Sequence, residues 1–138
     1  MHLLVGKVLA AAALPATGTL IDVGSGSGSP GLVFALLRDD LDVTLLEPRA
    51  RRWAFLREAS RAAGRTVRVL RVRHDGYRGA PARTVTLRGL ALSLADLAHL
   101  VEPGGRLVVL GGRPVTCGPF EPTSEGRSGG VAVFRRLG

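Results

Sequence analysis

An apolar run that ends at a glycine cluster constrains the fold of this chain most strongly. Residues 19–23 read Thr-Leu-Ile-Asp-Val, as in a short strand buried in a parallel sheet, and residues 24–31 read Gly-Ser-Gly-Ser-Gly-Ser-Pro-Gly. Pro30 has a fixed φ that suits the first turn of a helix, so we expect a helix over residues 30–38. A strand, a glycine-rich loop and a helix in this order predict an α/β fold with a ligand close to the loop.

Strands and helices continue to alternate after this unit. A second strand is expected at 42–47, and Pro48 then begins a helix that runs to Ala63 with Gly64 as its cap. The further expected elements are a helix at 92–101, a turn at 102–105 and strands at 66–72, 84–88, 106–112 and 131–136. We therefore predict a Rossmann-like, doubly wound and mostly parallel sheet with helices on both faces, in a single domain over residues 1–138.

The charge of the chain favours an anionic partner. Basic residues outnumber acidic ones by 19 to 11, and all of them except Lys7 are arginines, whose planar fork can donate two hydrogen bonds to one phosphate. Nucleic-acid contact is one interpretation, and the residue usage of a GC-rich genome is the other. The same choice applies to the arginines along or just after the helix at 48–63, which form either a phosphate-binding face or a solvated one. Trp53 and Phe55 of this helix are expected in the core; stacking on nucleic-acid bases is the alternative.

The front of the chain and its cysteine content favour a cytoplasmic protein. Residues 1–18 are apolar and rich in small residues, as in a signal peptide, but they lead directly into the first strand, so we expect a helix of the mature protein. The single cysteine, Cys117, excludes an internal disulfide and is expected to be an inert thiol. No apolar run reaches the roughly 18 residues that span a bilayer, and we expect neither a membrane nor a metal partner.

Two classes of ligand compete for the glycine-rich loop. Gly26 to Gly31 match the G-x-G-x-x-G pattern of dinucleotide-binding folds, with Glu47 placed 19 residues after Gly28. The register that starts at Asp22, acid-x-Gly-x-Gly-x-Gly, instead resembles the first motif of class I S-adenosylmethionine-dependent methyltransferases. In both registers Glu47 accepts hydrogen bonds from two ribose hydroxyls. The alternative for Glu47 is an acid placed by the dipole of the next helix, and the alternative for the loop is a plain Gly/Ser turn. A nicotinamide enzyme usually needs a second domain, so the chain length favours the methyltransferase.

Three segments carry a closer resemblance: LIDVGSGSGSPGL, LLEPRARRWAFL and TVTLRGLALSLADLAHLVEPGGRLVVLGG. Over residues 2–112 the chain resembles the bacterial 16S ribosomal RNA guanine-N7 methyltransferases, once called glucose-inhibited division protein B. The resemblance implies a reduced class I methyltransferase fold, S-adenosylmethionine as cofactor, and ribosomal RNA or the 30S subunit as partner. Guanine N7 has a lone pair and no proton to remove, so positioning suffices and no catalytic base is predicted.

The resemblance also assigns the site, residue by residue. It places the cofactor against Asp22, Gly24, Ser25, Gly26 and Gly28, with its ribose on Glu47. The adenine would meet His74 through its backbone and Asp75 through its carboxylate. Arg88 would steady the cofactor carboxylate or an RNA phosphate. The alternatives without a ligand are that His74 is a loop residue, that Asp75 shapes the turn before Gly76, and that Arg88 is a surface arginine.

The chain departs from the family pattern at four places. The segment before the first strand is reduced to one helix that begins at His2, and residues 113–130 are too short for the usual helix and full-length sixth strand. Ser29 stands where the family has phenylalanine, and Gly111 where it has lysine. Two other functions therefore stay open: an S-adenosylmethionine-binding module that needs a partner, and a small-molecule or protein methyltransferase on the same scaffold.

Overall fold

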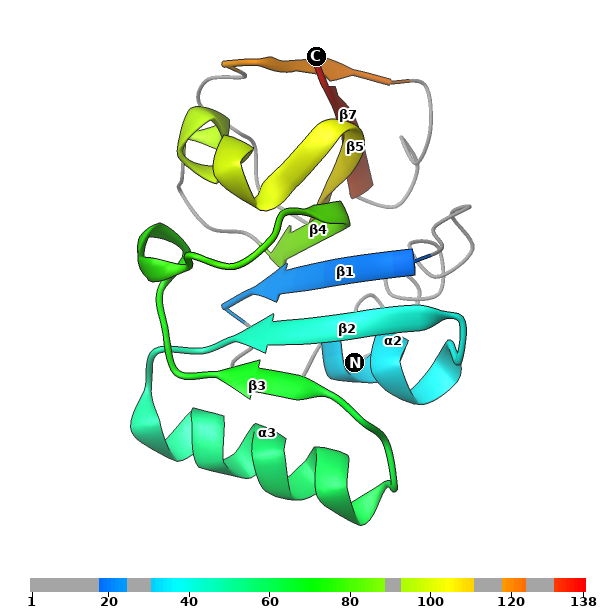
Figure 1. The fold of residues 1–138 in the computed structure, drawn as a ribbon, viewed down its shortest axis with the longest axis vertical. Helices are drawn as coiled ribbons and strands as arrows, with labels where there is room; N and C mark the ends of the chain where they lie inside the picture. The colour runs from blue at the N-terminus through cyan, green and yellow to red at the C-terminus, as the bar shows by residue number, and fades with distance from the viewer. Residues whose placement is uncertain (1–17, 25–30, 89–92, 111–117, 124–130) are drawn as a thin grey trace.

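The computed structural model describes residues 18–24, 31–88, 93–110, 118–123 and 131–138 (Figure 1). Within these ranges seven strands form one sheet in the order β3-β2-β1-β4-β5-β7-β6. Their bounds are β1 (Gly18–Val23), β2 (Leu41–Leu46), β3 (Arg68–Leu70), β4 (Ala82–Arg88), β5 (Val101–Leu110), β6 (Phe120–Pro122) and β7 (Val131–Arg136). The strands β1 to β5 lie parallel, whereas β7 is antiparallel to both β5 and β6. The predicted mostly parallel sheet is confirmed.

Helices pack on both faces of this sheet, as the alternating pattern predicted. The helices α2 (Gly31–Leu37) and α3 (Ala50–Ala62) pack on one face, where Phe34 and Leu56 join one apolar core. The 3-10 helix η2 (Leu94–Leu100) packs on the other face through Leu97. In Figure 1, η2 lies in front of the sheet and α2 lies behind β2. None of the described helices is long and apolar enough to cross a membrane.

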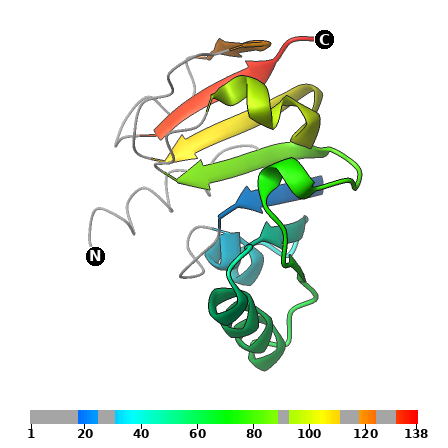
Figure 2. The same cartoon turned by 90° about the vertical axis from the view of Figure 1, so that its left-hand side faces the viewer.

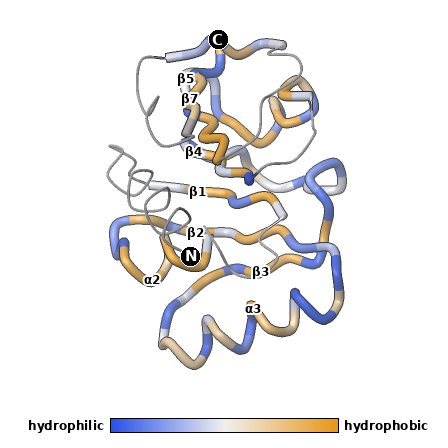
Figure 3. The backbone as a smooth tube through the Cα atoms, turned by 180° about the vertical axis from the view of Figure 1, so that it is seen from behind, coloured by the Kyte–Doolittle hydropathy of each residue, from blue (hydrophilic) through white to orange (hydrophobic). Residues whose placement is uncertain are grey.

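The alternation of side chains along each strand divides the core into two clusters. In β1, Leu20 belongs to the cluster under α2 and α3, whereas Ile21 and Val23 belong to the cluster under η2. Figure 3 shows the resulting hydrophobic colour along the central strands. Asp22 lies two residues from Leu20, so its side chain is on the α2 face of the sheet. This placement brings a carboxylate beneath the first turn of α2.

Several predicted boundaries are corrected by the structure. Residues 92–101, expected as a helix, contain a 3-10 helix that begins at Leu94, and the expected turn at 102–105 lies inside β5. Gly104 there has a φ of +80°, and the pairing of β4 with β5 shifts, so the strand continues past an irregularity. The segment at 113–130, for which no strand was predicted, contains β6. At three residues, β6 is too short to produce a periodic pattern.

The helix α3 packs on the sheet through a narrow stripe of side chains. Leu56 and Ser60 are buried, and half-buried Trp53 donates a hydrogen bond from Nε1 to the Val69 carbonyl at 2.9 Å. Phe55 is 53% exposed, so the prediction that it belongs to the core is wrong. Successive helical side chains advance by about 100°, which turns Phe55 away from its buried neighbour Leu56.

The cap of α3 follows the prediction, although the helix begins at Ala50 rather than at Pro48. Gly64 has a φ of +69° and donates its N–H to the Arg61 carbonyl at 3.0 Å, as expected of a glycine cap. Other predictions fall outside the described residues: the helix before β1, the start of a helix at Pro30, and the environment of Cys117.

Candidate functional site

The carboxyl ends of three neighbouring strands bring predicted site residues into one row. Val23 of β1 is in register with Leu46 of β2 and with Leu87 of β4. The residues that follow these three are Gly24, Glu47 and Arg88. They therefore lie at the same edge of the sheet, which is where doubly wound folds bind their ligands. Figure 2 shows the molecule with the side on which β1 to β3 end turned toward the viewer.

Gly24 turns the chain away from the sheet. Its φ is +68°, a conformation that side chains other than glycine rarely adopt, and its N–H donates to the Leu46 carbonyl at 2.9 Å. This bend is where the sequence predicted the start of the ligand-binding loop. The predicted contacts Ser25, Gly26 and Gly28 lie outside the described residues.

Asp22 is buried beneath this bend, between two strands and α2. Its side chain is 0% exposed, and its Oδ1 accepts a hydrogen bond from Thr86 Oγ1 of β4 at 2.5 Å. Gly31, the first residue of α2, lies directly against it: a Cβ at that position would stand 2.6 Å from Asp22 Cγ and 2.5 Å from Leu45 Cδ2. The carboxylate thus ties β1 to β4 and packs against the start of α2, close to both ends of the glycine-rich loop.

Glu47 directly follows β2 and is buried, with its side chain 1% exposed. Its Oε1 accepts the N–H of Arg49 at 3.2 Å and lies 3.8 Å from Arg49 Nε, while its own N–H donates to the Leu70 carbonyl at 2.9 Å. The contact with Arg49, the residue before α3, fits the alternative interpretation in which Glu47 is an acid placed at the start of the next helix. A carboxylate accepts several hydrogen bonds, so this role is compatible with ribose binding.

The 3-10 helix η1 (His74–Gly76) follows β3 at the same edge of the sheet. The His74 carbonyl lies 2.9 Å from His99 Nε2 and accepts the N–H of Tyr77 at 3.4 Å. The exposed Asp75 carboxylate lies 3.4 Å from Arg73 Nε. Contacts to the His74 carbonyl thus hold η1 in place. The Asp75 carboxylate pairs with Arg73, the residue just before η1.

A groove of about 420 Å³ lies next to η1, on the sheet face opposite α2 and α3. Thr44 and Leu70 form its floor, and the segment from Gly76 to Ala80 forms one wall. Tyr77 is half-buried there, and its hydroxyl donates to the Ala80 carbonyl at 2.7 Å. No motif marks Tyr77 in the sequence; its only signal is an aromatic residue within a polar turn.

Arg88, at the end of β4, is exposed and makes no ion pair with any residue that the structure describes. Groups of three His, Cys, Asp or Glu side chains able to hold a metal ion do not occur among the described residues.

Comparison with known proteins decides the family. The family described as rRNA small subunit methyltransferase G matches residues 2–116 of the chain. The chain belongs to this family. The ribosomal RNA small subunit methyltransferase G of Acidothermus cellulolyticus is 44% identical over 106 residues, and that of Salinispora arenicola is 46% identical over 112 residues. These alignments cover 74% and 72% of the chain but 47% and 46% of the relatives, so the chain spans about half of their length.

A solved structure of low sequence identity agrees with the methyltransferase G assignment at the level of the fold. The crystal structure of the antibiotic-resistance methyltransferase Kmr superposes with a TM-score of 0.68 at 19% identity, covering 94% of this chain and 91% of that one. The predicted class I methyltransferase fold and the predicted family are both confirmed.

Proposed function

We propose that the chain is an S-adenosylmethionine-dependent methyltransferase that transfers a methyl group to N7 of a guanine in 16S ribosomal RNA. Membership of the methyltransferase G family supports the proposal. The structural observation that carries it is the row of Gly24, Glu47 and Arg88 at the carboxyl edge of the sheet. This row combines a backbone bend, a buried carboxylate and an exposed guanidinium, the groups that a charged nucleoside requires.

The residues at this edge fit the nucleoside part of S-adenosylmethionine. Gly24 lacks a Cβ at the bend, so a ligand can approach the backbone closely, and Ser25, Gly26 and Gly28 would extend this contact. Glu47 offers a carboxylate to the two ribose hydroxyls, and hydrogen bonds to a charged group are stronger than neutral ones. Asp22 would act from below, by holding β1 and α2 in place.

The two ends of the cofactor would meet different strands. After β3, the backbone of His74 and the carboxylate of Asp75 would bind the edge of the adenine. At the end of β4, Arg88 would bind either the cofactor carboxylate or an RNA phosphate, because both are anions that match its planar fork.

The chemistry asks little of the protein beyond positioning. S-adenosylmethionine supplies a methyl group that is activated by its sulfonium. The acceptor N7 has a lone pair and carries no proton, so we assign no general base. Holding the base in line with the methyl group removes translational and rotational freedom before the reaction, which can supply most of the rate.

Calorimetry tests the cofactor site. We expect binding of S-adenosylmethionine, and Glu47→Ala should lower the affinity by about 1–3 kcal/mol because a charged hydrogen-bonding group is lost. Glu102→Ala is the matched control: it removes a carboxylate that pairs with Arg83 at 3.9 Å, at the start of β5. Unchanged affinity in Glu47→Ala would exclude this residue from the site, and tight binding of NAD without S-adenosylmethionine would overturn the cofactor assignment.

Methyl transfer tests the reaction. The substrate is the 30S subunit, or its ribosomal RNA, from cells that lack the native enzyme, and the product to be measured is N7-methylguanine. Cofactor binding without N7-methylguanine above background would favour a binding module that needs a partner. Transfer to a small molecule or a protein instead would assign the scaffold to another substrate.

A further inference from the structure

We infer that the carboxyl edge of the sheet carries a binding surface for single-stranded RNA, formed by Arg51, Arg52, Phe55, Arg71 and Arg78. We call these five residues the edge surface. The inference rests on the proposed function, because the edge surface would hold the RNA strand that leads into the site. It is carried by how the arginines are paired and by one exposed aromatic side chain.

Six of the arginines away from the site pair with carboxylates. At the amino ends of the strands, Arg83 pairs with Glu102 at 3.9 Å. On the second half of α3, Arg61 pairs with Glu58 at 2.7 Å. The other pairs of this kind are Arg38–Asp40, Arg65–Asp39, Arg68–Asp42 and Arg135–Glu121. At these six positions the positive charge is matched locally. Arg57, over the Trp53 ring, and Arg136, which donates to the Val101 carbonyl, have no carboxylate partner among the described residues.

The arginines of the edge surface have no carboxylate partner among the described residues. Arg51 and Arg52 lie in the first turn of α3 and are exposed. Arg71 follows β3, where its Nε donates to the Pro48 carbonyl at 3.5 Å, and Arg78 follows η1, where its Nη1 donates to the Asp75 carbonyl at 2.8 Å. Backbone carbonyls orient these two side chains but do not neutralise them.

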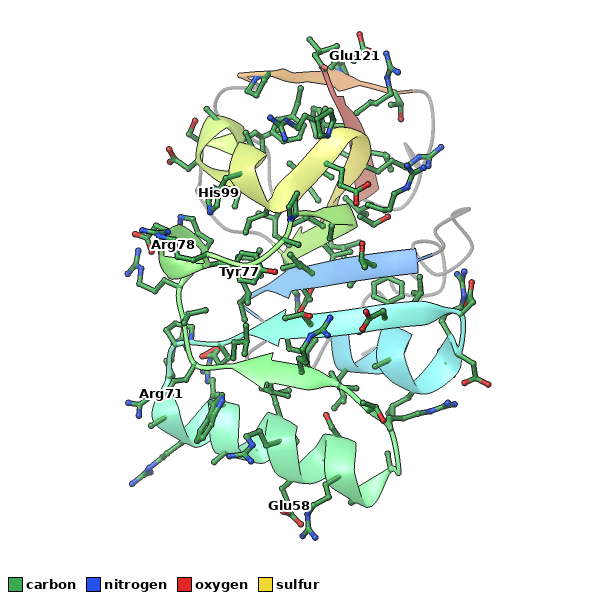
Figure 4. The ribbon with its side chains drawn as sticks, in the orientation of Figure 1. Glu58, Arg71, Tyr77, Arg78, His99 and Glu121 are labelled. Atoms are coloured by element: carbon green, nitrogen blue, oxygen red, sulfur yellow. The ribbon has the colours of Figure 1, made fainter. Side chains whose placement is uncertain are left out.

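The figures show the same separation of charge. In Figure 4, Arg71 and Arg78 lie on the side where the arrows of β1 to β3 end, whereas Glu58 and Glu121 lie away from that side. Figure 3 shows strongly hydrophilic colour at the start of α3 and in the segment after β3. Of three carboxylates at this edge, Asp22 and Glu47 are buried, and the exposed Asp75 lies 3.4 Å from Arg73 Nε, which offsets its charge. The edge surface therefore has a positive field toward solvent.

A polyanion is the partner that this field fits. Neighbouring arginines without counterions repel one another, and contact with successive phosphates removes this repulsion and releases condensed counterions. Each guanidinium can also bind a phosphate through two hydrogen bonds.

Phe55 indicates which kind of polyanion binds. It is 53% exposed and lies between Arg51 and Arg52 in angle around α3, since side chains advance by about 100° per residue. An exposed aromatic ring beside cations offers a stacking site for an unpaired base, which duplexes and acidic peptides do not present. The combination is typical of single-stranded RNA recognition.

Two matched variants test the charged part of the edge surface. The edge variant combines Arg51→Gln, Arg52→Gln, Arg71→Gln and Arg78→Gln. The control variant combines Arg38→Gln, Arg61→Gln, Arg83→Gln and Arg135→Gln, which removes the same charge from paired positions. Binding of a labelled single-stranded RNA that carries the 16S target sequence is measured by fluorescence anisotropy between 50 and 200 mM salt, after thermal melting has shown that both variants are folded.

Salt dependence gives the expected result. Four phosphate contacts to single-stranded RNA should weaken binding by about 50-fold across this salt range, from a slope of about −0.7 per contact. The edge variant should lose this part of the dependence, and the control variant should keep it. Equal salt dependence in the two variants would overturn the inference, as would binding of polyglutamate in place of RNA.

Phe55→Leu tests the stacking part separately. We expect its RNA affinity to fall by about fivefold or more with no change in the salt slope, because stacking releases no counterions. Unchanged affinity would contradict the stacking role. If the wild-type protein methylates N7 but the edge variant binds RNA as the control variant does, the edge surface is refuted and the proposed function stands. RNA binding that depends on the edge surface, without any N7 methylation, would overturn the proposed function and support the surface.

Discussion

Gly31→Ala should destabilise the protein through a contact at the first residue of α2. An added Cβ would stand 2.5 Å from Leu45 Cδ2 and 2.6 Å from both Cβ and Cγ of Asp22, closer than real Cβ atoms approach such neighbours. Neither neighbour can move easily: Leu45 is 0% exposed, and Asp22 is held by the hydroxyl of Thr86. The helix α2 would have to lift away from β1 and β2.

The expected loss of stability follows from two opposing effects. Inserting one carbon into a closely packed core costs about 1–3 kcal/mol. Alanine favours a helix over glycine by up to about 1 kcal/mol in the interior, and the gain is smaller at the first residue. The net change for Gly31→Ala should therefore be a destabilisation of about 1–2 kcal/mol.

Urea denaturation measures this change through the midpoint at constant slope. Gly76→Ala is the matched control, because the nearest atom to its added Cβ would be Val72 Cβ at 4.0 Å, an ordinary contact. We expect the control to stay within about 0.5 kcal/mol of the wild type. A Gly31→Ala protein as stable as the wild type would refute the close packing of α2 on Asp22.

Two further predictions concern carboxylates. Thr86→Val removes the hydroxyl that donates to buried Asp22 and should lower the free energy of unfolding, measured in urea, by about 1–3 kcal/mol. Thr86→Ser keeps a hydroxyl and should recover most of this loss. Equal losses in the two variants would show that the hydrogen bond is unimportant. The Arg38 guanidinium donates a hydrogen bond to Asp40 and holds the pKa of that carboxyl below its usual value. The pair therefore stabilises the fold above the unfolded pKa of about 3.9, and this stabilisation is lost as the pH falls through the folded pKa. Arg38→Gln should raise the pKa of Asp40 in an NMR titration, and an unchanged value would point to another cause.

The row at the carboxyl edge was predictable because its signals are local. Gly24 follows an apolar run, and Glu47 ends the next one, so each residue marks the end of its strand without any knowledge of the rest of the fold. Parallel pairing of the strands then brings the strand ends together.

Other features depend on contacts between distant segments. The partner of Asp22 is Thr86, 64 residues away, and no local pattern marks this pair. Phe120 is 4% exposed and secures β6 by packing in the core, although its segment has the composition of a loop. For Phe55, its apolar character suggested burial, but its angle around α3 directs it to solvent.

The net charge of +8 gives the sign of the favoured partner but not the place where it binds. Taken as one set, the arginines of α3 do not distinguish a phosphate-binding face from a solvated one. The fold divides them: the helix runs antiparallel to the strands, so Arg51 and Arg52 of its first turn lie at the carboxyl edge. Arg61, by contrast, lies near its far end and pairs with Glu58 at 2.7 Å. The acids at 39–42 precede or begin β2 and therefore lie at the opposite end of the sheet from Glu47. Among the described residues, several arginines without a carboxylate partner thus gather at one edge, next to the strand ends that form the candidate site.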